Sequence, residues 1–186
     1  MKKQLIFAAF LLVGFAASAQ TWTVDKAHSK LGFSITHMMI SDVEGNFKTF
    51  EASIASVKDD FSDAVFEISA DIPAINTDNE GRDKDLQSDR FFDAAKFPKL
   101  TFKSTSFTKV EGNKYKLVGD LTMKGVTKPV ELQVTINGPI DRRGKKVIGI
   151  KVAGIIKRTE FGVGGSGNAM VSEEVTLIAN GEFVKG

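Results

Sequence analysis

The stretch Val130-Glu131-Leu132-Gln133-Val134-Thr135-Ile136 alternates strictly between apolar and polar side chains. Alternation with a period of two is typical of a β-strand that turns one face to a core and the other to water. Similar runs recur on both sides of this stretch, and together with it they predict about eight strands. The other runs begin near Leu31, Phe47, Phe66, Leu100, Tyr115, Ile148 and Val175.

Eight short strands joined mostly by hairpins indicate an all-β antiparallel barrel or sandwich, and closure into a barrel is favoured because it leaves no exposed edge. The interior of such a barrel can be filled by side chains or can hold one elongated ligand. Residues 82–93 differ from the rest, since they are rich in charge and contain no β-branched residue. We expect a short helical segment there, with Ser88 as the N-cap of a turn that carries Phe91 and Phe92.

The amino terminus has the pattern of a secretory signal. Lys2 and Lys3 precede an almost entirely apolar run over residues 5–17, and small residues follow as far as Ala19. The run is too short to span a membrane, and a short buried helix is the alternative interpretation. We therefore expect a cleaved signal over residues 1–19, one domain over residues 20–186, a periplasmic location and no stable membrane insertion.

The composition narrows the class of protein. Removal of 19 of the 186 residues leaves 167, and the loss of Lys2 and Lys3 lowers the 25 Lys and Arg residues to 23, equal to the 23 Asp and Glu residues. A balanced charge does not favour nucleic acid or anionic membranes as partners. The absence of cysteine excludes disulfides and thiolate metal sites. Fifteen Phe residues provide apolar area for a core or for a pocket that takes greasy ligands.

Few residues are suited to catalysis or to metal binding. The only histidines, His28 and His37, have an odd spacing, so on one continuous strand they would face opposite sides. Ser29 follows His28 directly and points away from it, which argues against a nucleophile–base pair. The G-x-G-x-x-G pattern at residues 162–167 has no helix after it, and residues 76–81 lack the later bidentate Glu of a calcium loop. We expect no cofactor, no metal and no catalytic residue.

Polar residues at three places are candidates for recognising a ligand's head group. His37 has the inward parity of its strand, and it is either a satisfied polar group or a hydrogen-bond partner of a ligand. Arg82 and Leu86 share one helical face, which either is solvated or covers the barrel mouth with Arg82 and Asp83 toward a head group. Arg158 follows an apolar strand, and it either pairs with a carboxylate or recognises an anion.

An ordered set of short motifs resembles the YceI-like family of bacterial periplasmic proteins, which are lipocalin-like and polyisoprenoid-binding. The family often carries a histidine within the Arg-Asp-x-x-Leu motif, where this chain has Lys84-Asp85, so the role of that histidine does not carry over. The matching stretches are Trp22-Thr-Val-Asp25-Lys-Ala-His28-Ser29, Phe33 to His37, Gly45-Asn-Phe47, Ile75-Asn76-Thr77, Arg82-Asp83-Lys-Asp-Leu86, Phe91-Phe92-Asp93, Phe97-Pro98, Gly119-Asp-Leu121-Thr122-Met-Lys-Gly125-Val126-Thr-Lys128 and Arg158-Thr-Glu-Phe161-Gly162.

The resemblance implies an eight-stranded antiparallel barrel around a long apolar cavity that holds an isoprenoid or a similar amphiphile. We therefore expect a non-catalytic carrier. Two alternative functions stay open: an enzyme that uses His37 as a base on a hydrophobic substrate, and a structural barrel filled by its own side chains. The chain could also form a homodimer. The expected ligand-binding residues are Phe33, Ile35, His37, Phe66, Arg82, Asp83, Leu86, Phe91, Phe92, Phe102, Arg158 and Phe161.

Overall fold

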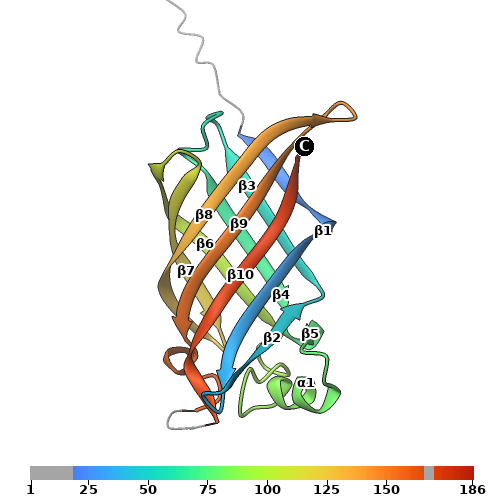
Figure 1. The fold of residues 1–186 in the computed structure, drawn as a ribbon, viewed down its shortest axis with the longest axis vertical. Helices are drawn as coiled ribbons and strands as arrows, with labels where there is room; N and C mark the ends of the chain where they lie inside the picture. The colour runs from blue at the N-terminus through green and yellow to red at the C-terminus, as the bar shows by residue number, and fades with distance from the viewer. Residues whose placement is uncertain (1–18, 166–169) are drawn as a thin grey trace, which may run out of the picture.

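The computed structural model describes residues 19–165 and 170–186. These residues form a closed antiparallel β-barrel of eight strands with one short α-helix at one end, which confirms the predicted fold (Figure 1). The predicted signal lies outside the described residues except for Ala19, and it stays a prediction. No helix of the described ranges is long and apolar enough to cross a membrane.

The ring follows the order of the chain. Each strand pairs antiparallel with the next, and β10 pairs with β1 to close the barrel. The strands of the ring are β1 (Gln20–His37), β3 (Phe50–Ser56), β4 (Val65–Asp71), β6 (Lys99–Glu111), β7 (Lys114–Met123), β8 (Val126–Arg142), β9 (Lys145–Lys157) and β10 (Val171–Lys185).

Two shorter strands complete the sheet. β2 (Ser41–Phe47) pairs with the second half of β1, whereas β3 pairs with its first residues, so β2 and β3 together act as one strand of the barrel. β5 (Ile75–Asn76) extends β2 at the helical end. Two 3₁₀ turns, η1 (Ile72–Ala74) and η2 (Arg158–Phe161), lie between strands.

The helical segment begins and ends earlier than the sequence predicts. α1 covers Glu80–Gln87, and Asn79 is its N-cap, with a side-chain oxygen that accepts a hydrogen bond from the backbone nitrogen of Arg82 at 3.0 Å. The prediction that Ser88 is an N-cap is wrong, because Ser88 is the C-cap and its hydroxyl donates to the carbonyl oxygen of Asp85 at 2.6 Å. Asn79 is as good an N-cap as Ser, and the acidic Glu80 in the first turn favours the same start.

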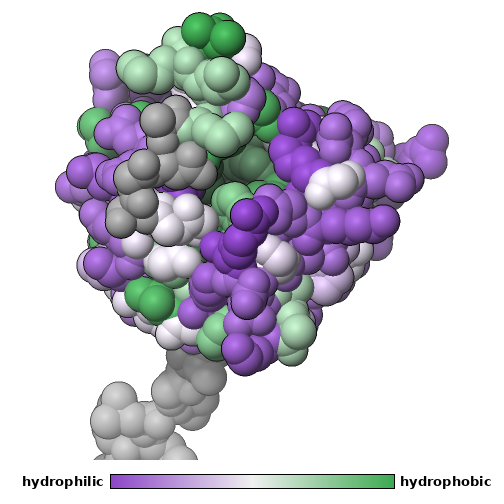
Figure 2. Space-filling view, turned by 90° about the horizontal axis from the view of Figure 1, so that it is seen from below, coloured by the Kyte–Doolittle hydropathy of each residue, from purple (hydrophilic) through white to green (hydrophobic). Residues whose placement is uncertain are grey.

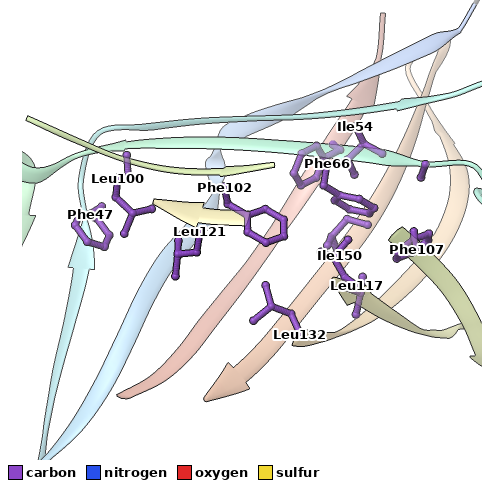
Figure 3. Close-up of a cluster of buried hydrophobic side chains, with 14 of the residues drawn as sticks. Phe47, Ile54, Phe66, Leu100, Phe102, Phe107, Leu117, Leu121, Leu132 and Ile150 are labelled. Atoms are coloured by element: carbon purple, nitrogen blue, oxygen red, sulfur yellow. The ribbon is translucent and has the colours of Figure 1, made fainter. Parts of the chain in front are cut away.

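The carboxyl terminus lies at the end of the barrel away from α1 (Figure 1). Aromatic side chains fill the interior toward that end, and Figure 3 shows Phe66 and Phe107 among the buried residues. The ring of Trp22 lies 5.5 Å from that of Phe61, and the ring of Phe107 lies 4.9 Å from Phe66 and 4.6 Å from Tyr115. All five side chains are buried. This half of the barrel therefore has the packed interior that the structural-barrel alternative expected of the whole.

Candidate ligand-binding cavity

The opposite end of the barrel, beside α1, opens into a cavity of about 700 Å³. Figure 2 looks into its mouth and shows apolar surface in the hollow with polar side chains around much of the rim. This volume lies within the range of roughly 300–1,000 Å³ that is usual for small-molecule sites. Inward-facing apolar residues of six strands form the wall: Phe33, Ile35, Val43, Phe47, Leu100, Met123, Ile156, Val175 and Leu177.

Glycines leave room for aromatic rings inside the barrel. Gly45 lies opposite Phe33 in the β1–β2 ladder, and a Cβ atom at Gly45 would lie only 2.3 Å from Cζ of Phe33, which lines the cavity. In the packed interior, a Cβ at Gly119 would likewise lie 2.4 Å from Cζ of Phe102. Each ring occupies the space that a side chain at the glycine would need. Glycine in a strand often marks such a close approach.

Eight of the twelve predicted site residues line this cavity. The three from β1 confirm the inward parity that the alternation predicts, because Phe33, Ile35 and His37 share one wall. The others come from α1, from the turns after it and from η2, which shows that the helical segment borders the mouth. They are Arg82, Leu86, Phe91, Phe92 and Arg158. Their role in binding stays a prediction.

The other four predicted residues do not line the cavity, and their role in ligand binding stays a prediction. Phe66 and Phe102 point inward, but both are buried in the packed interior, where Phe102 lies opposite Leu121 (Figure 3). Phe161 is almost completely buried within η2. The Asp83 carboxylate is hydrogen-bonded to Thr77.

Asp83 and Arg82 both bind the buried residue Thr77. The Asp83 carboxylate accepts hydrogen bonds from the Thr77 backbone nitrogen at 2.8 Å and from its hydroxyl at 2.5 Å. The Arg82 guanidinium donates to the Thr77 hydroxyl oxygen at 2.8 Å and to its carbonyl oxygen at 2.7 Å. These bonds fasten α1 to the chain after β5 and hold the exposed Arg82 side chain at the mouth. Thr77 itself lines the cavity and was not among the predicted site residues, although it ends the Ile75-Asn76-Thr77 motif of the family resemblance.

A second charged group from the helical segment also lies at the mouth. Arg90 and Asp85 line the cavity and form an ion pair with each other. The carboxylate of Asp85 raises the pKa of the Arg90 guanidinium above its ordinary value through a hydrogen bond and charge attraction. The rim therefore carries two arginines of which one, Arg90, is already paired.

Arg158 is the buried cation of the site, with only 4% of its surface exposed. The hydrogen bonds that it donates to described residues all end on backbone carbonyls, those of Ser172 and Val163 at 2.8 Å, of Gly165 at 3.0 Å and of Val171 at 3.3 Å. Burial lowers the pKa of the guanidinium, and the charge of Glu173 opposes this shift. The carboxylate partner that the sequence suggested is therefore replaced by carbonyl dipoles.

The four bonds decide how Arg158 can act on a ligand. A guanidinium has five N–H donors, so at most one remains for a ligand. Arg158 contributes mainly its charge to the cavity, while its hydrogen bonds tie η2, the chain after it and the start of β10 together.

His37 lies at the rim, at the end of β1. Its imidazole has no hydrogen-bond partner among the residues that the structure describes, so it is available to a ligand. A hydrogen bond to a ligand and the base of the enzyme alternative both stay open as roles for His37.

His28 and Ser29 belong to a different cluster, on the outer face of the barrel. His28 Nδ1 lies 3.0 Å from Asp25 and 3.9 Å from Glu182, a grouping that could hold a cation. Arg142 already forms ion pairs with both carboxylates and so provides that cation. His28 and Arg142 together lower the pKa of Asp25. Ser29 hydrogen-bonds to the backbone of Glu182 and not to His28, as the expected strand geometry requires.

The fold and the cavity define a lipocalin-like barrel with one open, ligand-sized interior. The chain belongs to the YceI-like family, since the YceI-like domain matches residues 22–183. It is 37% identical over 171 residues to the UPF0312 protein SA2479 of Staphylococcus aureus strain N315, which covers 87% of this chain and 96% of that protein.

Solved structures have the same fold. The YCEI protein of Campylobacter jejuni is similar with a TM-score of 0.74 and 32% identity, over 100% of this chain and 99% of that one. Burkholderia cenocepacia BcnA also has a TM-score of 0.74, with 26% identity over 87% of this chain and 98% of that one. A polyisoprenoid binding domain from Saccharophagus degradans has a TM-score of 0.66 over 89% of this chain and 98% of that one, but at 14% identity it shares the fold alone.

Proposed function

We propose that this protein binds a polyisoprenoid or a similar amphiphilic lipid in the cavity and carries or stores it without chemical change. The observation that carries the proposal is the apolar cavity of about 700 Å³, which is open at one end only and has its polar groups near the mouth. Membership of the YceI-like family supports the same ligand class. The domain from Saccharophagus degradans, which shares the fold, is named a polyisoprenoid binding domain, and this agrees with the proposal.

The wall provides the driving force for binding. Burial of a methylene group stabilises by about 0.8 kcal/mol, so a chain of several isoprene units gains several times that amount. The ordering of the flexible chain offsets part of this gain. Since the wall is almost entirely aliphatic and aromatic, it selects by length and width, and it makes no demand on the chemistry of the tail.

The mouth provides orientation. Arg82, Arg90 and His37 stand at the rim, so the head group of the ligand lies there and its tail points toward the aromatic end. The charge of Arg158 favours a head group that is anionic or rich in acceptors. Selectivity for the head group then comes from these few groups, while affinity comes from the wall.

Two substitutions on one strand test this proposal. Leu177 lines the cavity, whereas the next residue, Ile178, faces outward and is exposed. Leu177→Trp puts an indole into the lumen, and we expect it to abolish the uptake of an added isoprenoid and the recovery of lipid by solvent extraction and mass spectrometry. Ile178→Trp adds the same group outside and should bind like the wild type. Equal uptake by both variants, or no lipid and no uptake with the wild-type protein, would refute the proposal.

We also propose that the carrier works in the periplasm after cleavage behind Ala19. The start of β1 at Gln20, directly after that site, supports this boundary. Amino-terminal sequencing of the protein recovered from the periplasmic fraction tests it, and a chain that still begins at Met1 would contradict it.

A further inference from the structure

The turn between β1 and β2 exposes three consecutive apolar residues beside the mouth of the cavity. Met38, Met39 and Ile40, here called the apolar tip, are 53%, 90% and 82% exposed. The backbone nitrogen of Met38 donates to the carbonyl oxygen of Met170 at 2.7 Å, and Met170 is a half-exposed residue of the cavity lining. Figure 2 shows apolar residues projecting from the rim next to the hollow. The apolar tip and the cavity wall therefore form one continuous apolar surface.

The apolar tip has an unusual backbone conformation for its residue types. Met38 and Met39 have φ angles of 50° and 58°, and Ile40 donates its backbone nitrogen to the carbonyl oxygen of His37 at 3.1 Å. Residues 37–40 therefore form a β-turn with positive φ at both central positions, within a three-residue hairpin loop, and Asn and Gly are the residues that favour such φ angles. Methionine is disfavoured there by the backbone and by contact with water. Such a combination is expected where a strained position serves a function.

Within residues 19–165 and 170–186, the other exposed large apolar residues do not form three consecutive positions beside the cavity. Val110 and Ile140 lie toward the aromatic end, and Ile155 and Ile178 are on the outer faces of β9 and β10. Single exposed apolar residues are normal on a protein surface, whereas a contiguous group next to a ligand site marks an interaction surface.

We propose that the apolar tip inserts into the surface of a lipid bilayer, so that the mouth faces the membrane and the ligand passes directly between the bilayer and the cavity. This inference rests on the proposed lipid ligand. A tail that left a bilayer through water would expose its methylene groups on the way, and a continuous apolar rim removes that step. The apolar tip therefore contacts the acyl-chain region of the membrane.

The charge near the apolar tip indicates the kind of membrane contact. Asp42 follows the tip closely and is exposed, and its carboxylate accepts a hydrogen bond from the hydroxyl of Thr36 at 2.8 Å. Glu44 lies further along the same strand. Carboxylates and not lysines directly flank the apolar tip, so insertion of the tip itself does not depend on anionic lipid. Of the two rim arginines that would also face the membrane, Arg90 is paired with Asp85 and Arg82 is hydrogen-bonded to Thr77. We therefore expect binding to zwitterionic phosphatidylcholine vesicles.

A fluorescent probe tests the contact independently of the ligand. The chain has no cysteine, so Met39→Cys and Ile140→Cys each provide one labelling site, at the mouth and toward the opposite end. An environment-sensitive dye on Cys at position 39 should shift to the blue when phosphatidylcholine vesicles are added. The same dye at position 140 should not shift. The absence of a shift at position 39, or an equal shift at both positions, would overturn the proposal.

A double variant tests the consequence for transfer. Met38→Asn with Met39→Gly supplies the preferred turn residues and removes the apolar side chains, so it should fold at least as well as the wild type. We expect the uptake of isoprenoid from vesicles to slow at least tenfold, with unchanged binding of farnesol that is dissolved below its aggregation limit. Unchanged uptake from vesicles would overturn the docking proposal alone. Failure of the wild-type protein to bind dissolved farnesol would instead count against the proposed function, while the probe still reports on docking.

Discussion

Replacement of Arg158 by Met tests whether this buried cation is mainly a structural tie. The substitution keeps an unbranched side chain of similar reach but removes the charge and all five N–H donors. The carbonyl groups of Val163, Gly165, Val171 and Ser172 then lose their hydrogen bonds from residue 158.

The size of the effect follows from how well water can replace each bond. The bond to Val163 is buried, so its carbonyl bears a desolvation cost of roughly 1–3 kcal/mol when it is left unpaired. The other three carbonyls are partly exposed and can be rehydrated, which limits the loss to about 0.5–1 kcal/mol each. We expect a total loss of about 2.5–6 kcal/mol in the free energy of unfolding, a large share of the roughly 5–15 kcal/mol that is typical of a domain.

Chemical denaturation measures this loss. The single Trp, Trp22, is buried at the aromatic end, so its fluorescence reports global unfolding far from the substitution. The midpoint in guanidinium chloride should fall for Arg158→Met, with little change in slope. Arg158→Lys serves as the control for charge, and it should lose most of the same stability because a single ammonium group cannot reproduce the forked geometry. An unchanged midpoint for Arg158→Met, or full stability of Arg158→Lys, would refute the reasoning.

Two further predictions concern the lumen and the closed end. Gly45→Ala should displace the flexible Phe33 ring into the cavity and lower isoprenoid uptake measured by titration. In the control variant Gly149→Ala, the new Cβ has only an ordinary contact, so uptake should be normal. Equal uptake by the two variants would argue against the close approach of Phe33 to Gly45. The hydroxyl of Ser56 donates to Asp63 and lowers the pKa of Asp63 from 3.8 to about 2. Because the folded pKa lies below the unfolded value, the stabilisation is present above about pH 4 and is lost as the pH falls toward 2. Asp63→Asn should therefore be less stable at neutral pH and lose less stability across that window in thermal melts, and an equally steep loss would contradict this assignment.

The strands and their inward faces could be predicted because alternation is a local property. Phe33, Ile35 and His37 follow one another at a spacing of two, so their common wall is fixed as soon as the strand is recognised. The same rule places Phe66 and Phe102 inside the barrel, correctly, but it does not say at which depth the interior stops being filled. That depth depends on the side chains that meet across the lumen, and these are distant in the sequence.

The polar part of the site was harder to predict for a related reason. The partners of Arg158 are backbone carbonyls, which every residue possesses, so the sequence contains no sign of them. Thr77 is held at the cavity by hydrogen bonds to the side chains of Arg82 and Asp83 in α1, and the sequence around Thr77 does not indicate these bonds. Inward residues such as Leu177 could have been found, because β10 alternates as clearly as β1 does.

The aromatic packing of Trp22, Phe61, Phe66, Phe107 and Tyr115 makes the barrel a blind tube. A molecule that enters tail first must leave head first through the same opening, so loading and delivery cannot take place at opposite ends. Whatever receives the cargo has to approach the face that the donor has just left. Cargo longer than the tube is deep keeps its excess outside, within reach of that recipient.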